Sequence, residues 1–189
     1  MKKQFISLFI LYSFISYPQS KKPDFQNAYW GMTKKEVIKS SIRKLKDIGE
    51  DYISVEDHVG FYNAEIHYNF VNDTLNGGMI IFKINHTNNN DFIDDFDNIK
   101  SLLSIKYGKP DYCHVDWKND MYKGDKQYYG LAVSMGDLTY GANWFFVPGT
   151  WVGESLTGDN YKIELSIIYQ STKYKYLNDR VNKNLSKDF

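Results

Sequence analysis

The sequence predicts an α+β fold, in which an antiparallel sheet carries helices packed on one face and is built from two helix-plus-strands units in tandem. Amphipathic helical patterns begin near residues 33 and 91, and each precedes several segments that alternate between apolar and polar residues. Short turns join the strands within each group, so consecutive strands must pair antiparallel. Because each helix can bury its apolar stripe only against the sheet, the other sheet face is expected to stay open.

The first helix is predicted to begin directly after Thr33. Thr33 and Glu36 have the spacing of a capping box, in which each side chain bonds the other residue's backbone N–H. Apolar residues continue at helical spacing as far as Ile48, so the helix is expected to reach that residue. Trp30 precedes the cap and is expected to anchor the helix to the sheet rather than to bind a ligand.

The clearest strand of the first unit is the segment FYNAEIHYNFVND at 61–73, where apolar and polar residues alternate. Its apolar face holds Tyr62, Ala64, Ile66, Tyr68 and Phe70. Its other face holds Phe61, Asn63, Glu65, His67 and Asn69. Further strands are predicted at 52–58 and 79–84, on either side of it.

The second unit is predicted to open with a helix from Asp91 to Tyr107, which has a continuous apolar stripe and acidic first turns. Gly108 and Pro110 mark its end. Strands are then predicted at 112–117, 128–134, 142–147, 150–156 and 161–170. Glycines 130, 136 and 141 are interpreted as scattered turn residues rather than a phosphate-binding loop.

Three segments make up the predicted organisation of the chain. Residues 1–20 begin with two lysines and continue with a short apolar run, which is typical of a secretory signal peptide. Residues 21–171 are predicted to form one α+β domain, with units at about 28–86 and 88–171. Residues 172–189 are expected to form a basic C-terminal helix or tail. The chain is therefore expected to be exported, to a periplasmic or extracellular location.

Charge and cysteine content exclude several classes of protein. The chain holds 23 basic and 23 acidic residues, and removing residues 1–20 would leave a net charge of −2. A nucleic-acid-binding protein would normally carry a basic bias, so no nucleic-acid partner is expected. No segment is apolar enough for a transmembrane helix. Cys113 is the only cysteine, and its alternation with Val115 and Trp117 predicts that it faces the core.

No catalytic or cofactor motif is present in the sequence. The four histidines lack the spacing of a metal site, and nucleotide-binding and G-x-S-x-G patterns are absent. His114 is expected to lie on the opposite strand face from Cys113, so the two could not form a nucleophile and base. We therefore predict no catalytic residue, no metal site and no cofactor.

Four short motifs carry a resemblance to a known group of proteins. They are WGMTKKEV at 30–37, YNFVNDTL at 68–75, LSIKYGKP at 103–110 and IELSIIY at 163–169. Together they resemble motifs of exported bacterial proteins with the β-lactamase-inhibitor-like fold, a group related to small outer-membrane assembly lipoproteins. The resemblance implies a fold of helix-plus-sheet repeats. The chain differs from the lipoproteins because no cysteine follows its apolar leader.

The sequence favours a recognition surface over a catalytic constellation. Strand alternation places Asn63, Glu65, His67 and Asn69 on the open sheet face, and Trp151 is expected to point to the same side. Aromatic and adaptable polar side chains are the usual materials of such a surface. The leading hypothesis is an exported, non-catalytic binding module for a protein partner. The alternatives are an envelope or extracellular hydrolase with a site assembled from distant residues, and a structural envelope component.

Overall fold

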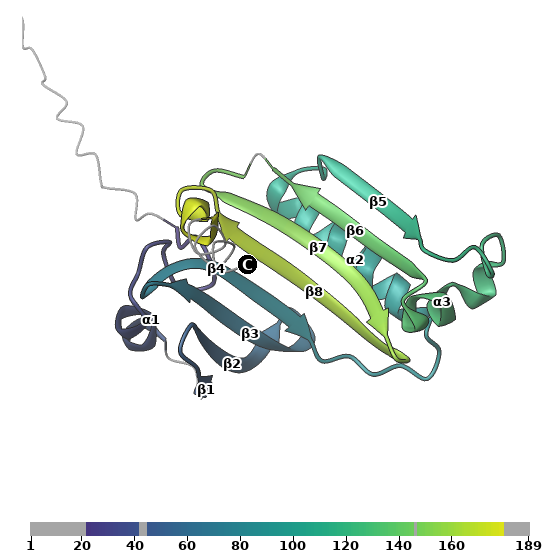
Figure 1. Cartoon of the computed structure of the whole chain (residues 1–189), viewed down its shortest axis with the longest axis horizontal. Helices are drawn as coiled ribbons and strands as arrows, with labels where there is room; N and C mark the ends of the chain where they lie inside the picture. The colour runs from purple at the N-terminus through teal and green to yellow at the C-terminus, as the bar shows by residue number, and fades with distance from the viewer. Residues whose placement is uncertain (1–21, 42–44, 146, 180–189) are drawn as a thin grey trace, which may run out of the picture.

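Eight strands form one antiparallel sheet in the computed structural model, which describes residues 22–41, 45–145 and 147–179 (Figure 1). The strands are β1 (Leu45–Ile48), β2 (Tyr52–Val59), β3 (Tyr62–Val71), β4 (Thr74–Phe82), β5 (Tyr112–Trp117), β6 (Leu138–Trp144), β7 (Thr150–Asp159) and β8 (Lys162–Ser171). The helices are α1 (Lys34–Ser40), α2 (Asp91–Tyr107), α3 (Tyr129–Met135) and the 3-10 turn η1 (Lys126–Tyr128). Residues 175–179 are also helical. The predicted α+β class is confirmed.

The strand order shows how the two units are joined. It runs β1-β2-β3-β4-β8-β7-β6-β5, so the last strand of each unit lies at the centre of the sheet. β4 and β8 pair antiparallel there, and each unit extends outward from this pair in the same sequence order. Two helix-plus-strands units therefore share one sheet, in an arrangement with approximate two-fold symmetry.

The two faces of the sheet have different partners. On the core face, Ile66, Ile80 and Ile167 follow one another across β3, β4 and β8, and all are buried. Helices α2 and α3 pack against β6, β7 and β8 on that side, and α2 is seen behind the strands in Figure 1. The opposite side, here called the open face, carries Glu65 and Met79 among its residues. None of the helices in the described ranges is long and apolar enough to span a membrane.

The start of the first unit follows the predicted capping box. The Thr33 hydroxyl accepts from the Glu36 backbone N–H at 3.3 Å, and the Glu36 carboxylate accepts from the Thr33 N–H at 2.8 Å. Trp30 donates from Nε1 to the Thr150 hydroxyl on β7 at 2.8 Å and stacks on Phe25. Trp30 thus anchors the segment ahead of α1, as its position in the sequence suggested.

The expected end of the first helix was wrong. The helix ends at Ser40, and Leu45–Ile48 forms edge strand β1, which pairs with β2. Residue 42 lies outside the described residues. Helical spacing of apolar residues could not reveal this strand, because β1 depends on pairing with a neighbour; the Ile48 side chain remains half exposed.

The predicted strand at 128–134 was also wrong, because this segment forms α3. Asp125 caps the preceding turn by accepting from the Gln127 N–H, and Gly130 packs so closely on the Asn89 backbone that an added Cβ would come within 2.2 Å of it. Gly130 is therefore a helix-packing residue rather than a turn residue. Gly141 lies inside β6, while Gly136, with φ +79°, does end α3.

The other elements of the second unit are close to their predicted positions. Helix α2 begins at Asp91 and ends at Tyr107, with Gly108 at φ +84° after it. β5 matches the prediction, and β7 and β8 contain the predicted ranges to within one residue. The strand expected at 142–147 lies at Leu138–Trp144 instead.

Candidate functional site

The five predicted binding residues all lie on the open face. Asn63, Glu65, His67 and Asn69 alternate along β3 with the buried core residues of that strand. Register across the sheet places Trp151 on β7 in the same row as Asn69. Three strand spacings separate these two residues, or about 14 Å. The five residues therefore belong to one face, but they do not form one cluster of contacting side chains.

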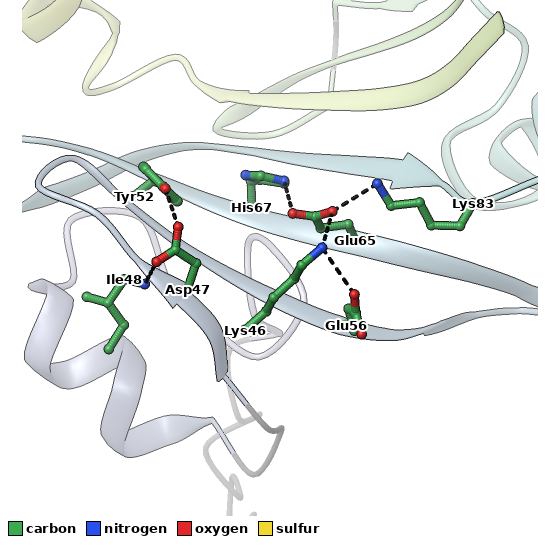
Figure 2. Close-up of polar contacts among 8 residues, drawn as sticks. All are labelled: Lys46, Asp47, Ile48, Tyr52, Glu56, Glu65, His67 and Lys83. Atoms are coloured by element: carbon green, nitrogen blue, oxygen red, sulfur yellow. Dashed lines mark hydrogen bonds and ion pairs between the residues drawn. The ribbon is translucent and has the colours of Figure 1, made fainter. Parts of the chain in front are cut away.

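A network of ion pairs surrounds Glu65 in Figure 2. The carboxylate accepts from Lys46 Nζ and from Lys83 Nζ, each at 2.9 Å, and Lys46 also pairs with Glu56 at 3.1 Å. His67 Nε2 lies 3.1 Å from Glu65 Oε1, without hydrogen-bond geometry to any atom in the described ranges. The lysines come from β1 and from the residue after β4, so Glu65 connects three strands.

The hydrogen bonds from Lys83 and Lys46 lower the pKa of Glu65 to about 2. A carboxylate with this pKa is ionised throughout the physiological range and is a weak base. Glu65 is thus poorly suited to general acid–base catalysis, although its carboxylate and the His67 ring both present hydrogen-bonding atoms to a ligand.

A hollow of about 610 Å³ opens beside this network, between β2, β3, β4, β8 and the helical segment at 175–179. Its polar lining includes Tyr52, Glu65, His67, Asn69, Gln170 and Asn178. Tyr52 is held by the hydrogen bond that its hydroxyl donates to Asp47 (Figure 2). Three of the five predicted residues therefore line one concavity, whereas Asn63 lies outside it.

Side-chain amides fasten the helical segment at 175–179 to the rim of this hollow. Gln170 Nε2 donates to the Asn76 carbonyl oxygen at 2.6 Å, and Asn76 Nδ2 donates to Asn178 Oδ1 at 2.8 Å. Asn178 Nδ2 donates to Gln170 Oε1 at 3.4 Å. The sequence did not predict this cluster of three residues. They meet only because β4 pairs with β8 and the helical segment at 175–179 packs beside both strands.

Trp151 lines a second hollow of about 560 Å³, which also includes Phe145 and Lys175. Gln170 borders both hollows, so they adjoin across β8. The Trp151 ring lies across Gly153, where an added Cβ would come within 2.8 Å of the ring. Gly153 therefore lets the indole lie against the sheet, which keeps this part of the surface shallow and aromatic.

Between the polar network and Trp151, the open face is apolar. Met79 and Ile81 of β4 and Ile168 of β8 lie half-buried there, with Met79 opposite Ile168. An apolar centre with polar and aromatic groups around it has the composition of a protein-recognition surface.

The cluster that most resembles a catalytic site, formed by His86, Asp95 and Tyr62, lies on the helix side of the sheet. His86 Nε2 is 2.6 Å from Asp95 Oδ2, and the Tyr62 hydroxyl donates to Asp95 Oδ1 at 2.8 Å. Burial and this hydrogen bond raise the pKa of Tyr62 to about 12. Neither His86 nor Asp95 lines the two hollows. The trio connects β3, the residues after β4 and the second turn of α2, so it fixes the position of the helix.

Cys113 is on the core face of the sheet, as expected, but it is not buried in the core. It lies on the same sheet face as Val115 and on the opposite face from His114, as alternation required, but its side chain is exposed because β5 is an edge strand.

In the described part of the chain, no group of three His, Cys, Asp or Glu residues could hold a metal ion.

We expect Cys113 to react rapidly with a water-soluble thiol reagent in the native protein, because its side chain is exposed on an edge strand. Mass spectrometry over a time course at neutral pH measures this. Labelling that requires denaturant would show that the thiol is buried after all.

Comparison of the chain with family models, with curated proteins and with solved structures found no match. The resemblance to exported proteins of the β-lactamase-inhibitor-like fold therefore remains a prediction from short motifs.

Proposed function

We propose that this protein is an exported, non-catalytic binding module that recognises a protein partner with its open face. One observation carries the proposal: an eight-stranded sheet buries one face under α2 and α3, while its other face presents two adjoining hollows and a half-buried apolar centre. Apolar surface surrounded by polar groups marks interaction sites on proteins.

The chemistry of the face favours binding over turnover. Two lysines balance the negative charge of the Glu65 carboxylate, whose pKa is about 2. The His86–Asp95 pair positions α2. Trp151, the half-buried indole of the second hollow, has the character of an interface hot spot. The hydrogen bonds that fix Gln170 and Asn178 reduce the entropy lost when a partner binds.

Export is the part of the proposal that rests on sequence alone. The basic start and apolar run of residues 1–20 support it, and these residues lie outside the described ranges. N-terminal sequencing of the protein from its native source tests this part. Cleavage near Ser20 is expected, and an intact Met1 on a cytoplasmic protein would refute export.

The binding proposal predicts that a His67→Ala, Trp151→Ala double variant loses affinity for the partner. The partner is first captured from the native envelope and medium with the wild-type protein, then identified by mass spectrometry and purified. We expect the double variant to lose about 2 kcal/mol or more of binding free energy, as is usual for hot-spot residues. Isothermal titration calorimetry gives the affinity, and a thermal melt reports on folding.

The matched control is a Leu102→Ala, Ile105→Ala double variant on helix α2, which packs on the other side of the sheet. Both residues are strongly exposed, and both lie away from the two hollows. This control should bind like the wild type. Equal affinities for both double variants, with unchanged melts, would assign partner recognition to another surface.

A further inference from the structure

The two edge strands of the sheet, β1 and β5, differ in the features that prevent pairing with another chain. β1 has four residues, carries the charged Lys46, and is interrupted by a register shift between Leu45 and Asp47. β5 has six residues in unbroken register with β6, and none of them is lysine, proline or glycine. Bulges and lysines are among the features that keep an edge strand from pairing with another chain. β1 has such features, and β5 lacks them.

Apolar side chains are exposed on both sides of β5. Tyr112 is 56% exposed on the open face, and Val115 is 52% exposed on the core face. Cys113, next to Val115 on the core face, is exposed as well. Their exposure shows that the described helices do not overhang this edge, so a second strand can approach it from outside.

The hydrogen bonds of β5 show which backbone groups face outward. Lys118, directly after β5, donates its N–H to the Asp137 carbonyl oxygen of the neighbouring segment at 2.8 Å. In an antiparallel pair, residues with inward and outward backbone groups alternate. Cys113, Val115 and Trp117 therefore direct their N–H and C=O groups away from β6, where the strand of another chain can pair with them.

We propose that β5 pairs antiparallel with β5 of a second copy of this chain, across a two-fold axis at Val115. This register pairs outward-facing residues with one another. On the open face it places His114 opposite Asp116 of the second copy, and Asp116 opposite the second copy's His114. A register centred on His114 would oppose two histidines and one centred on Asp116 would oppose two carboxylates, whereas the axis at Val115 pairs each imidazole with a carboxylate, as His114 and Asp116 already lie 3.7 Å apart within one chain.

The pairing goes beyond the proposed partner-binding function and does not depend on it. A two-fold axis perpendicular to the sheet keeps the open faces of both copies on the same side. The dimer would therefore present two copies of each hollow on one continuous sheet, and it would bind a repetitive or dimeric partner with avidity.

The test is the oligomeric state of the full chain, measured by sedimentation velocity through the micromolar range. The wild type is expected to dimerise, and Val115→Lys, which places two lysines against each other, is expected to be monomeric with an unchanged circular dichroism spectrum. A monomeric wild type overturns the proposal. A Val115→Lys variant that still dimerises overturns it equally, because the contact must then lie elsewhere.

Cysteine cross-linking provides a second test that does not require a dissociated variant. In a Cys113→Ser background, Val115→Cys should form a covalent dimer on mild oxidation, because paired Cα atoms about 5.5 Å apart suit a disulfide. Ile48→Cys, an exposed position on the β1 edge, is the matched control and should stay monomeric. Equal cross-linking at the two positions would show random collisions and would refute the pairing at β5.

Discussion

Replacing Phe25 with alanine is expected to lower the free energy of unfolding by about 3–5 kcal/mol, the usual cost of removing a buried aromatic ring. Phe25 is 2% exposed and stacks on Trp30, with ring centroids 6.0 Å apart and planes 9° apart. It also contacts Tyr68 of β3 and Tyr169 of β8, at centroid distances of 5.2 and 5.1 Å. The ring therefore connects the segment ahead of α1 to strands from both units.

Gly78 of β4 lies directly beneath this ring, where an added Cβ would come within 2.4 Å of Phe25. The ring therefore fills the space that Gly78 leaves by having no side chain. Denaturant unfolding measures the loss. Phe61→Ala is the matched control, because Phe61 is fully exposed and should change stability by no more than about 0.5 kcal/mol. Similar losses for both variants would contradict this packing.

The second large effect concerns Glu154, a buried carboxyl group on the core face of β7. It is 2% exposed, and neither of its oxygens has a hydrogen-bond partner in the described part of the chain. Burial raises its pKa to about 9; Asp97 contributes in the same direction, and Lys100 opposes them. Glu154 is therefore protonated in the folded protein at neutral pH.

Unfolding should release this proton, because the pKa of an unfolded glutamate is about 4.3. The contribution of Glu154 to stability is complete below that value and is lost as the pH rises toward about 9. Between the two values, the free energy of unfolding should fall by about 1.4 kcal/mol per pH unit. Glu154→Gln should remove this slope and stabilise the protein by about 4 kcal/mol at neutral pH.

Chemical unfolding of the wild type and Glu154→Gln, from about pH 5 to about pH 8, tests this linkage. Glu164→Gln replaces an exposed glutamate on β8 and is the matched control, which should keep the wild-type slope. Parallel pH profiles for wild type and Glu154→Gln would show that Glu154 is already ionised in the folded state.

Local patterns in the sequence predicted the elements that local interactions determine. The Thr33–Glu36 capping box and the Gly108 end of α2 depend on residues a few positions apart, and both are confirmed. Helix α3 was missed because its position depends on Gly130 meeting the backbone of Asn89, a contact between distant segments. The aromatic and β-branched composition of the segment indicated a strand instead.

The same distinction applies to the open face. The period of two along β3 is sufficient to place Asn63, Glu65, His67 and Asn69 on one side. Strand order is not visible in that pattern, so the partnership of Gln170 with Asn178 could not be predicted. Cys113 shows the same limit, because its face was predicted correctly while its exposure depends on β5 being at the edge.

Site-specific photo-cross-linking tests most directly whether the open face contacts the partner. A benzophenone amino acid replaces Asn69, an exposed residue in the lining of the first hollow, or Ile105, an exposed residue on α2. Each protein is mixed with the captured partner, irradiated and analysed by mass spectrometry. A recognition surface on the open face predicts a covalent adduct from position 69 and none from position 105. An adduct from position 105 with none from position 69 would place the partner on the helix side and contradict the proposal.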